Sequence, residues 1–170
     1  MKTVEKNFAF IDSQNLILGI KSLGWKLNFR KFRRYLKEKY SVDNAYMFIG
    51  YIPDNTRLYT SLQESGFILN FKPVLDYKNL EIVKGNIDAD LVLLAMLEYK
   101  NYDKAVIVSS DGDFYSLVEH LYKENKLKAV LSPHIKTCSQ LLKRSGKDKI
   151  RFMDNLRNKL EYIKNEKAPL

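Results

Sequence analysis

Short apolar runs rich in β-forming residues alternate along this chain with segments of helical periodicity. Such alternation is typical of βαβ units, which build a parallel sheet covered by helices. We therefore predict an α/β fold of three layers, Rossmann-like, with a central and mostly parallel sheet flanked by helices. The expected strands are 7–12, 44–51, 67–71, 104–109, 127–131 and 149–153, and the expected helices are 15–22, 28–39, 55–65, 88–100, 113–124, 136–144 and 153–165.

Four of these segments carry further information. The runs 8–11 and 105–108 are apolar without alternation, which predicts central strands covered on both faces. Segment 88–100 is apolar nearly all round, which predicts a buried helix packed on the sheet. In segment 153–165, apolar residues repeat at spacings of 3, 4 and 3 on a basic background, which predicts an amphipathic helix. That helix would dock on the domain or form a homodimer contact.

The charge of the chain is unevenly distributed. The net charge is +9, with +6 in residues 26–40, +5 in residues 143–167 and about −2 in the remainder. Two basic blocks around an acidic remainder fit a protein that binds phosphates, and a solvated basic surface fits equally well. The longest apolar run is too short for a membrane span, we find no signal peptide, and the single cysteine excludes an internal disulfide. We expect a cytoplasmic protein without a membrane partner.

Four aspartates stand at strand ends or helix starts: Asp12, Asp88, Asp111 and Asp113. The carboxyl ends of parallel strands share one edge of the sheet, so these side chains can meet in space. Clustered carboxylates repel one another, and a hard divalent cation relieves that repulsion. The pattern therefore predicts a site for Mg²⁺ or Mn²⁺.

Each aspartate also has a purely structural interpretation. Asp12 could cap the helix that follows it, and Asp88 could be an acidic residue favoured in the first turn by the helix dipole. Asp113 follows a serine by three residues, which matches a loose capping box. Gly112 between two aspartates favours a functional interpretation, because a tight turn there would point both carboxylates to one place.

The runs FIDSQNL, KGNIDADLVLLAM and VIVSSDGDFYSLVEHL resemble the NYN domain, a branch of the PIN-like nuclease superfamily. The resemblance extends from about Asn7 to about Pro133. It implies a PIN-like fold, an acidic divalent-metal site and RNA as substrate. By position, the family's acidic residues match Asp12, Asp88, Asp111 and Asp113, its asparagine matches Asn15, and its strand-end hydroxyl residue matches Ser109. We accordingly expect a nuclease domain at 1–135, with a basic helical extension at 136–170 packed on it.

We predict from this resemblance a metal-dependent ribonuclease in which those six residues are catalytic and the four aspartates bind the metal. The expected RNA contacts are basic residues of segment 28–39 and of the loop before Asp88, namely Arg30, Arg33, Arg34, Lys37 and Lys84. One alternative is a non-catalytic module that binds RNA or a protein. Another is a phosphatase in which the first aspartate of Asp111-Gly112-Asp113 attacks a small phosphoester.

Overall fold

The computed structural model describes residues 4–72 and 86–164. Within them the chain forms one sheet of six strands in the order β3-β2-β1-β4-β5-β6, and every neighbouring pair is parallel. The strands are β1 (Asn7–Asp12), β2 (Val42–Gly50), β3 (Phe67–Lys72), β4 (Ala105–Val108), β5 (Leu127–Ser132) and β6 (Ile150–Phe152). The α-helices are α1 (Ser13–Ser22), α2 (Phe29–Tyr40), α3 (Thr56–Glu64), α4 (Asn86–Leu97), α5 (Tyr115–Lys123), α6 (Gln140–Gly146) and α7 (Arg157–Leu160), and the short 3₁₀ turns are η1 (Pro53–Asn55), η2 (Gly112–Phe114), η3 (Lys147–Lys149) and η4 (Asp154–Leu156).

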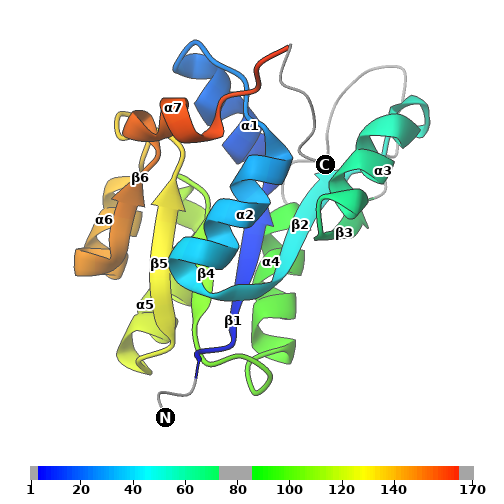
Figure 1. The fold of residues 1–170 in the computed structure, drawn as a ribbon. Helices are drawn as coiled ribbons and strands as arrows, with labels where there is room; N and C mark the ends of the chain where they lie inside the picture. The colour runs from blue at the N-terminus through cyan, green and yellow to red at the C-terminus, as the bar shows by residue number, and fades with distance from the viewer. Residues whose placement is uncertain (1–3, 73–85, 165–170) are drawn as a thin grey trace.

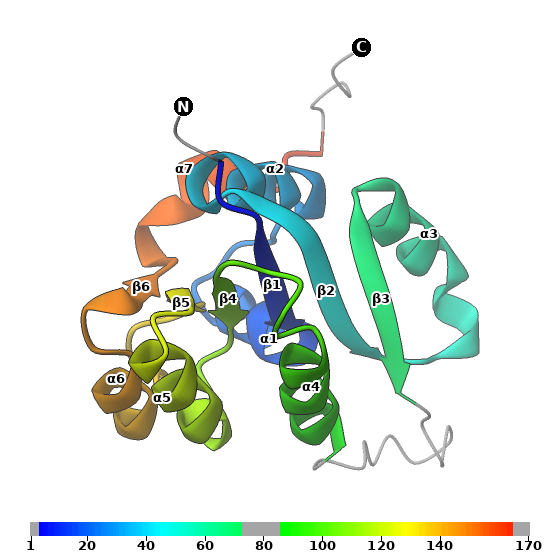
Figure 2. The same ribbon diagram turned by 90° about the horizontal axis from the view of Figure 1, so that it is seen from below.

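Helices cover both faces of this sheet, so the predicted three-layer α/β fold is confirmed (Figure 1). Apolar side chains of α1, α2, α3 and α7 pack in one core cluster, and those of α4, α5 and α6 pack in another on the opposite face. Figure 2 shows α4, α5 and α6 along one side of the strands, with α2 and α7 along the other. The strands alternate between the two cores, because successive side chains point to opposite faces.

The strand order reverses between β1 and β4, the two central strands. All residues of β1 and β4 are buried, as the unbroken apolar runs predicted. The chain builds outward to β2 and β3 on one side of β1, then returns to β4 and builds outward to β5 and β6 on the other. In open α/β sheets ligands bind at such a reversal, beyond the carboxyl ends of the strands. Asp12 ends β1 at this place, and Ser109 directly follows β4.

Helix α4 departs from the prediction that it is buried all round. It packs against β1 and β2, and its outer side chains remain in solvent: Leu93 is 58% exposed and Leu97 is 69% exposed. The prediction was wrong because a one-sided contact with the sheet leaves the far side of an apolar helix uncovered. Residues 73–85 before α4, which include the predicted RNA contact Lys84, lie outside the described residues.

The C-terminal segment also differs from its prediction. Instead of one helix over 153–165, the chain forms the short turn η4 and the four-residue helix α7, then becomes extended at Glu161. The carbonyl of Leu160 accepts a hydrogen bond from the Asn28 N–H at 2.8 Å, and Leu27 pairs with Glu161 in an isolated antiparallel bridge. These contacts with a distant segment end the helix. A homodimer through this region stays a prediction. The continuous helix that was expected to form its contact is not present between residues 153 and 164.

The end of the chain contributes a strand as well as helices. β6 pairs with β5, and Met153 and Leu160 are buried in the core beside α2. The division of the chain at residue 135 stays a prediction. Among residues 4–72 and 86–164, no helix combines the length and apolar character needed to cross a bilayer.

Candidate metal centre

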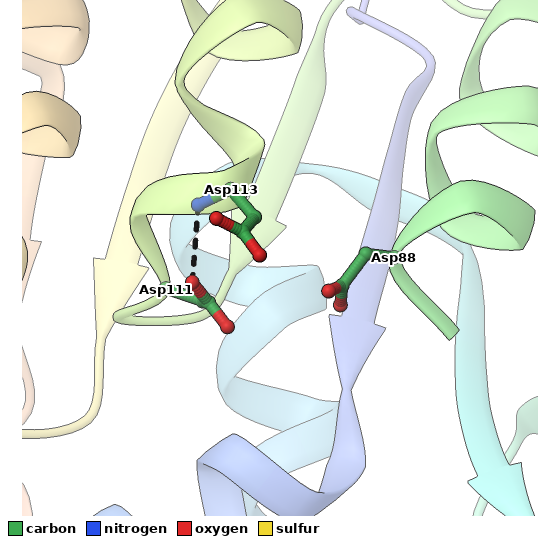
Figure 3. Close-up of side chains that lie close together, drawn as sticks. All are labelled: Asp88, Asp111 and Asp113. Carbon is green, nitrogen blue, oxygen red and sulfur yellow. Dashed lines mark hydrogen bonds between the residues drawn. The ribbon is translucent and has the colours of Figure 1, made fainter. Parts of the chain in front are cut away.

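Three aspartates converge at the carboxyl edge of the sheet. A carboxylate oxygen from each of Asp88, Asp111 and Asp113 lies within 4.8 Å of the other two. Asp88 stands in the first turn of α4, and the other two follow β4, so the cluster joins segments far apart in the sequence (Figure 3). Oxygen ligands in such a group suit Mg²⁺ and Mn²⁺, the hard cations that prefer carboxylates.

The turn after β4 is held by its own polar side chains. The Asp111 carboxylate accepts a hydrogen bond from the Asp113 N–H at 3.0 Å, which caps η2 (Figure 3). The Asp111 N–H in turn donates to Ser109 Oγ at 3.1 Å. The alternative interpretation of Asp113 as part of a capping box is wrong, because Asp111 caps η2 and Ser110 Oγ shares a hydrogen bond of 2.8 Å with Ser132 Oγ. Asp111 therefore performs the capping role and contributes an oxygen to the cluster as well.

Gly112 is needed for packing rather than for an unusual backbone angle. A Cβ at this position would lie 2.5 Å from Ser139 Oγ, which requires a shift, and 3.1 Å from Ser139 Cβ, which is a tight contact. The segment around Ser139 is fixed there, since its N–H donates to the Ser110 carbonyl at 3.0 Å. Ser139 also caps α6 by accepting from the Leu141 N–H. Thus α6 buttresses the turn that presents Asp111 and Asp113.

Asp12 is set deeper than the three-residue cluster. It is 7% exposed and caps α1 by accepting from the Asn15 N–H at 3.1 Å, so the structural interpretation of this residue is confirmed. Ser109 Oγ donates to its other oxygen at 3.3 Å. Burial raises the pKa of Asp12 to about 6, and the charges of Asp88 and Asp111 add to the rise against the two hydrogen bonds. The charges of the cluster therefore repel the ionised form of Asp12, whose carboxylate lies outside the group of three.

Asn15 connects the two turns. Its side-chain oxygen accepts a hydrogen bond from the Ser110 N–H at 2.7 Å, across from α1 to the end of β4. Asn15 is one of the six residues predicted to be catalytic, and that role stays a prediction. In the structure its side-chain oxygen fixes the position of the turn that carries Asp111. Ser109 adds a second link between the two turns through its hydrogen bond to Asp12.

Two of the three carboxylates, those of Asp111 and Asp113, have no cationic partner in the part of the chain that the structure describes. Adjacent carboxylates without a cation raise each other's energy, and a divalent ion in their midst removes the repulsion. The donor set thus fits the Mg²⁺ or Mn²⁺ expected from the sequence.

The basic residues predicted to bind RNA lie elsewhere. Arg30, Arg34 and Lys37 are exposed on α2, which covers the sheet face opposite α4 (Figure 2). Arg34 lines a groove of about 470 Å³ between α2 and α7, together with Lys31, Lys39 and Lys159. The guanidinium of Arg33 is instead engaged with three backbone carbonyls, those of Gly66, Val42 and Asp43. Lys84 lies outside the described residues.

Two features of the site were missed from the sequence. Ser132 and Ser139 support the β4 turn, and the polar residue at the end of the buried run 127–131 was the available signal for Ser132. The second feature is an ion pair of 3.1 Å between Lys72 and Asp90, two residues after the cluster residue Asp88. Nothing in the sequence pairs these two residues, because they meet only when β3 and α4 are folded.

The fold and site together define an α/β protein of Rossmann-like topology with an acidic centre at the strand-order reversal. The family model for the NYN domain matches residues 8–151, and the chain belongs to this nuclease-type family. The match continues past Pro133, where we had expected the resemblance to end, and extends into β6. The chain is 24% identical over 161 residues to the low amplitude and bright protein LabA of Synechococcus elongatus, covering 89% of this chain and 86% of that protein. A protein of unknown function from Vibrio parahaemolyticus has a similar fold, with a TM-score of 0.74, 23% identity and coverage of 94% of this chain and 98% of that one.

Proposed function

We propose that this protein is a divalent-metal-dependent ribonuclease that hydrolyses phosphodiester bonds at the Asp88–Asp111–Asp113 cluster. The observation that carries the proposal is the convergence of these three carboxylates within 4.8 Å at the strand-order reversal of a nuclease-type fold. A bound Mg²⁺ or Mn²⁺ would supply hydroxide near neutral pH and neutralise charge on the phosphoryl oxygens.

The chain's own residues would have three tasks in this reaction. Asp88, Asp111 and Asp113 hold the ion and thereby place a scissile phosphate. Asp12, buried and hydrogen-bonded by Ser109, adds negative potential behind them and can accept a proton, since burial raises its pKa to about 6. Asn15 and Ser139 keep the Asp111 turn in place through Ser110.

RNA is the proposed substrate because the surface away from the metal centre is basic. Residues 26–40 carry a net charge of +6, and the groove between α2 and α7 is lined by four cationic side chains against Glu38. Because α2 and α4 cover opposite faces, these cations would hold a segment of RNA away from the scissile phosphate. Replacing Arg34 and Lys37 with alanine should weaken binding and lower the slope of log K against log salt by about 2. If the slope of log K against log salt is unchanged in this variant, α2 is not part of the RNA-binding surface.

Cleavage of labelled single-stranded RNA tests the proposal directly. Purified protein should cleave with Mg²⁺ or Mn²⁺, stop in EDTA, and lose activity in Asp111→Asn. Asparagine at 111 can still accept the Asp113 N–H bond, so the turn should survive. Glu119→Gln is a matched control, since Glu119 is an exposed acid on α5 paired with Lys123.

Two other outcomes would point to different functions. Tight RNA or protein binding without cleavage by the folded wild type would favour the non-catalytic binding module. A trapped phospho-aspartate at Asp111 after incubation with a small phosphoester would favour the phosphatase.

A further inference from the structure

A pocket of about 210 Å³ lies between the face of β3 and the outer side of α4, beside the metal centre. It is smaller than the roughly 300 Å³ of pockets that take drug-sized ligands, so it suits a single ring system. Its apolar wall includes Phe48 of β2 and Leu94 and Leu97 of α4. Its polar lining comes from Asn70, Lys72 and Asp90.

The pocket and Asp12, which lies behind the three-aspartate cluster, share one row of the sheet. Asp12 is in register with Phe48, and Phe48 is in register with Asn70, so the three residues lie side by side on neighbouring strands. Neighbouring strands are about 4.8 Å apart, which places Asn70 about 10 Å from Asp12. On α4, Asp90 lines the pocket and Asp88, two residues before it, belongs to the cluster. A nucleotide whose phosphate lies at the cluster could therefore reach the pocket with its base.

The polar lining is charged and incompletely used by the protein. Lys72 is 8% exposed, and its ammonium contacts the Asp90 carboxylate at 3.1 Å. Among the described residues, Asp90 is the one acceptor for the three N–H groups of Lys72, and no hydrogen bond engages the Asn70 side chain. Buried donors normally have partners, so a ligand with hydrogen-bonding groups complements this end of the pocket.

The apolar wall of the pocket is also incompletely covered by the described residues. The pocket-lining residues of α4 after Asp90 are Leu93, Leu94 and Leu97, which form one stripe of the helix along the pocket. Leu93 and Leu97 are 58% and 69% exposed. Large exposed leucines beside a buried lysine and its exposed carboxylate partner match a flat aromatic ligand with polar edges. RNA bases are recognised by apolar packing on the ring and hydrogen bonds to its edge.

We propose that this pocket binds one unstacked base of the RNA substrate and favours guanine. Guanine presents two adjacent N–H donors, which a carboxylate such as Asp90 can accept together, beside a carbonyl oxygen that Lys72 can bond. Adenine, cytosine and uracil lack that pair of ring and exocyclic donors. The proposal names the substrate preference of the proposed ribonuclease, and it rests on RNA being the ligand of that site.

Binding measurements on the Asp111→Asn protein test the pocket without cleavage. The four probes are fluorescein-labelled hexauridylate and its three derivatives with one central residue replaced by G, A or C, titrated in Mg²⁺ and followed by anisotropy. The G-containing probe should bind about tenfold more tightly than the others, the discrimination typical of one bidentate base contact. Adding Asp90→Asn should reduce the ratio to within about twofold, because an amide cannot accept both donors.

A second variant guards against misfolding of the first. Leu93→Ser with Leu97→Ser alters exposed positions and should weaken binding of all four probes about tenfold. Met96→Ala is the matched control, since Met96 is exposed on the same helix and does not line the pocket, and it should bind like the parent. Equal affinities for the four probes, or an unchanged ratio in Asp90→Asn, would overturn the proposal. So would sedimentation showing a dimer that the leucine variant dissociates, because the face would then be covered by a second copy.

The two proposals can fail separately. Guanine-dependent binding that Asp90→Asn removes, without cleavage by the wild type, would leave the pocket in place and reject the ribonuclease. Metal-dependent cleavage with equal binding of all probes would reject the pocket alone.

Discussion

The turn after β1 and the turn after β4 both carry aspartates at the carboxyl edge of the sheet, and they treat them differently. Asp12 is 7% exposed, accepts hydrogen bonds from Asn15 and Ser109, and has a pKa raised by burial. Asp113 is exposed, and Asp111 is only half-buried. The turn after β1 thus buries its carboxylate, and the turn after β4 leaves its two carboxylates accessible to solvent.

This difference in burial indicates two different tasks for the aspartates: binding an ion and setting the electrostatic potential around it. A carboxylate that must bind an ion from solution has to be accessible, and the exposed turn satisfies that condition. A buried carboxylate cannot exchange an ion as freely, yet its charge acts through a low-dielectric interior and reaches its neighbours more strongly. We infer that the β4 turn with Asp88 holds the ion and that Asp12 sets the potential behind it.

The largest effect expected from this comparison is on metal-dependent cleavage. Asp113→Asn should lower the cleavage rate about a thousandfold, a loss of roughly 4 kcal/mol of transition-state stabilisation. Asp12→Asn should weaken Mn²⁺ binding less than tenfold, whereas Asp113→Asn and Asp88→Asn should each weaken it more. Titration of the metal-free proteins with Mn²⁺ measures this order. Equal losses of affinity in Asp12→Asn and Asp113→Asn would place Asp12 among the ligands.

The next largest effect is expected where α6 supports the turn after β4. Gly112→Ala places a methyl group 2.5 Å from Ser139 Oγ, so the turn, α6 or the capping side chain of Ser139 must shift. We expect a loss of about 2 kcal/mol in the free energy of unfolding, the usual cost of overpacking, together with weaker Mn²⁺ binding. Ser139→Gly in the same chain removes both clashing atoms and should restore part of the metal affinity. Failure of this rescue would mean that Ser139 does not determine the position of the turn.

Asn15 links the two turns, and its removal should have a smaller effect. Asn15→Ala leaves the N–H of Ser110, a residue that is 4% exposed, without its acceptor. The expected cost is about 1.5 kcal/mol in urea unfolding, because an unsatisfied buried donor loses its hydration without compensation. Asn15→Asp keeps the acceptor and should recover that stability at low pH, where its carboxyl is uncharged. If both variants unfold like the wild type, the link is not a structural one.

The fold was predictable from the sequence to the extent that local patterns determine it. Unbroken apolar runs identified β1 and β4, and strand-end aspartates indicated the edge where the site forms. Contacts between distant segments were not predictable. The C-terminal helix ends at Leu160 because Asn28 bonds its carbonyl, and Arg33 is used by the carbonyls of Gly66, Val42 and Asp43. The sequence also could not distinguish Asp12 from the other aspartates, because burial depends on how α1 and β4 pack.

The smallest expected effect is on the pH dependence of the free energy of unfolding, which should distinguish the buried Asp12 from the more exposed aspartates. Asp12 has a pKa of about 6 in the folded protein, against an ordinary value of 3.8. Folding therefore binds its proton more tightly, and this contribution to stability is present below pH 3.8 and lost as the pH rises through 6.

For the metal-free wild type we accordingly expect a loss of about 1 kcal/mol in the free energy of unfolding between pH 5 and pH 7 that Asp12→Asn does not show. Urea unfolding in EDTA at the two pH values measures this difference. Asparagine keeps the acceptor for the Asn15 N–H, so the cap of α1 is retained and the comparison isolates the charge. Mn²⁺ near the cluster should reduce the loss in the wild type, because a cation favours the ionised carboxylate. An equal pH dependence in both proteins would show that Asp12 is not held apart from solvent, and the contrast between the two turns would then have to rest on geometry alone.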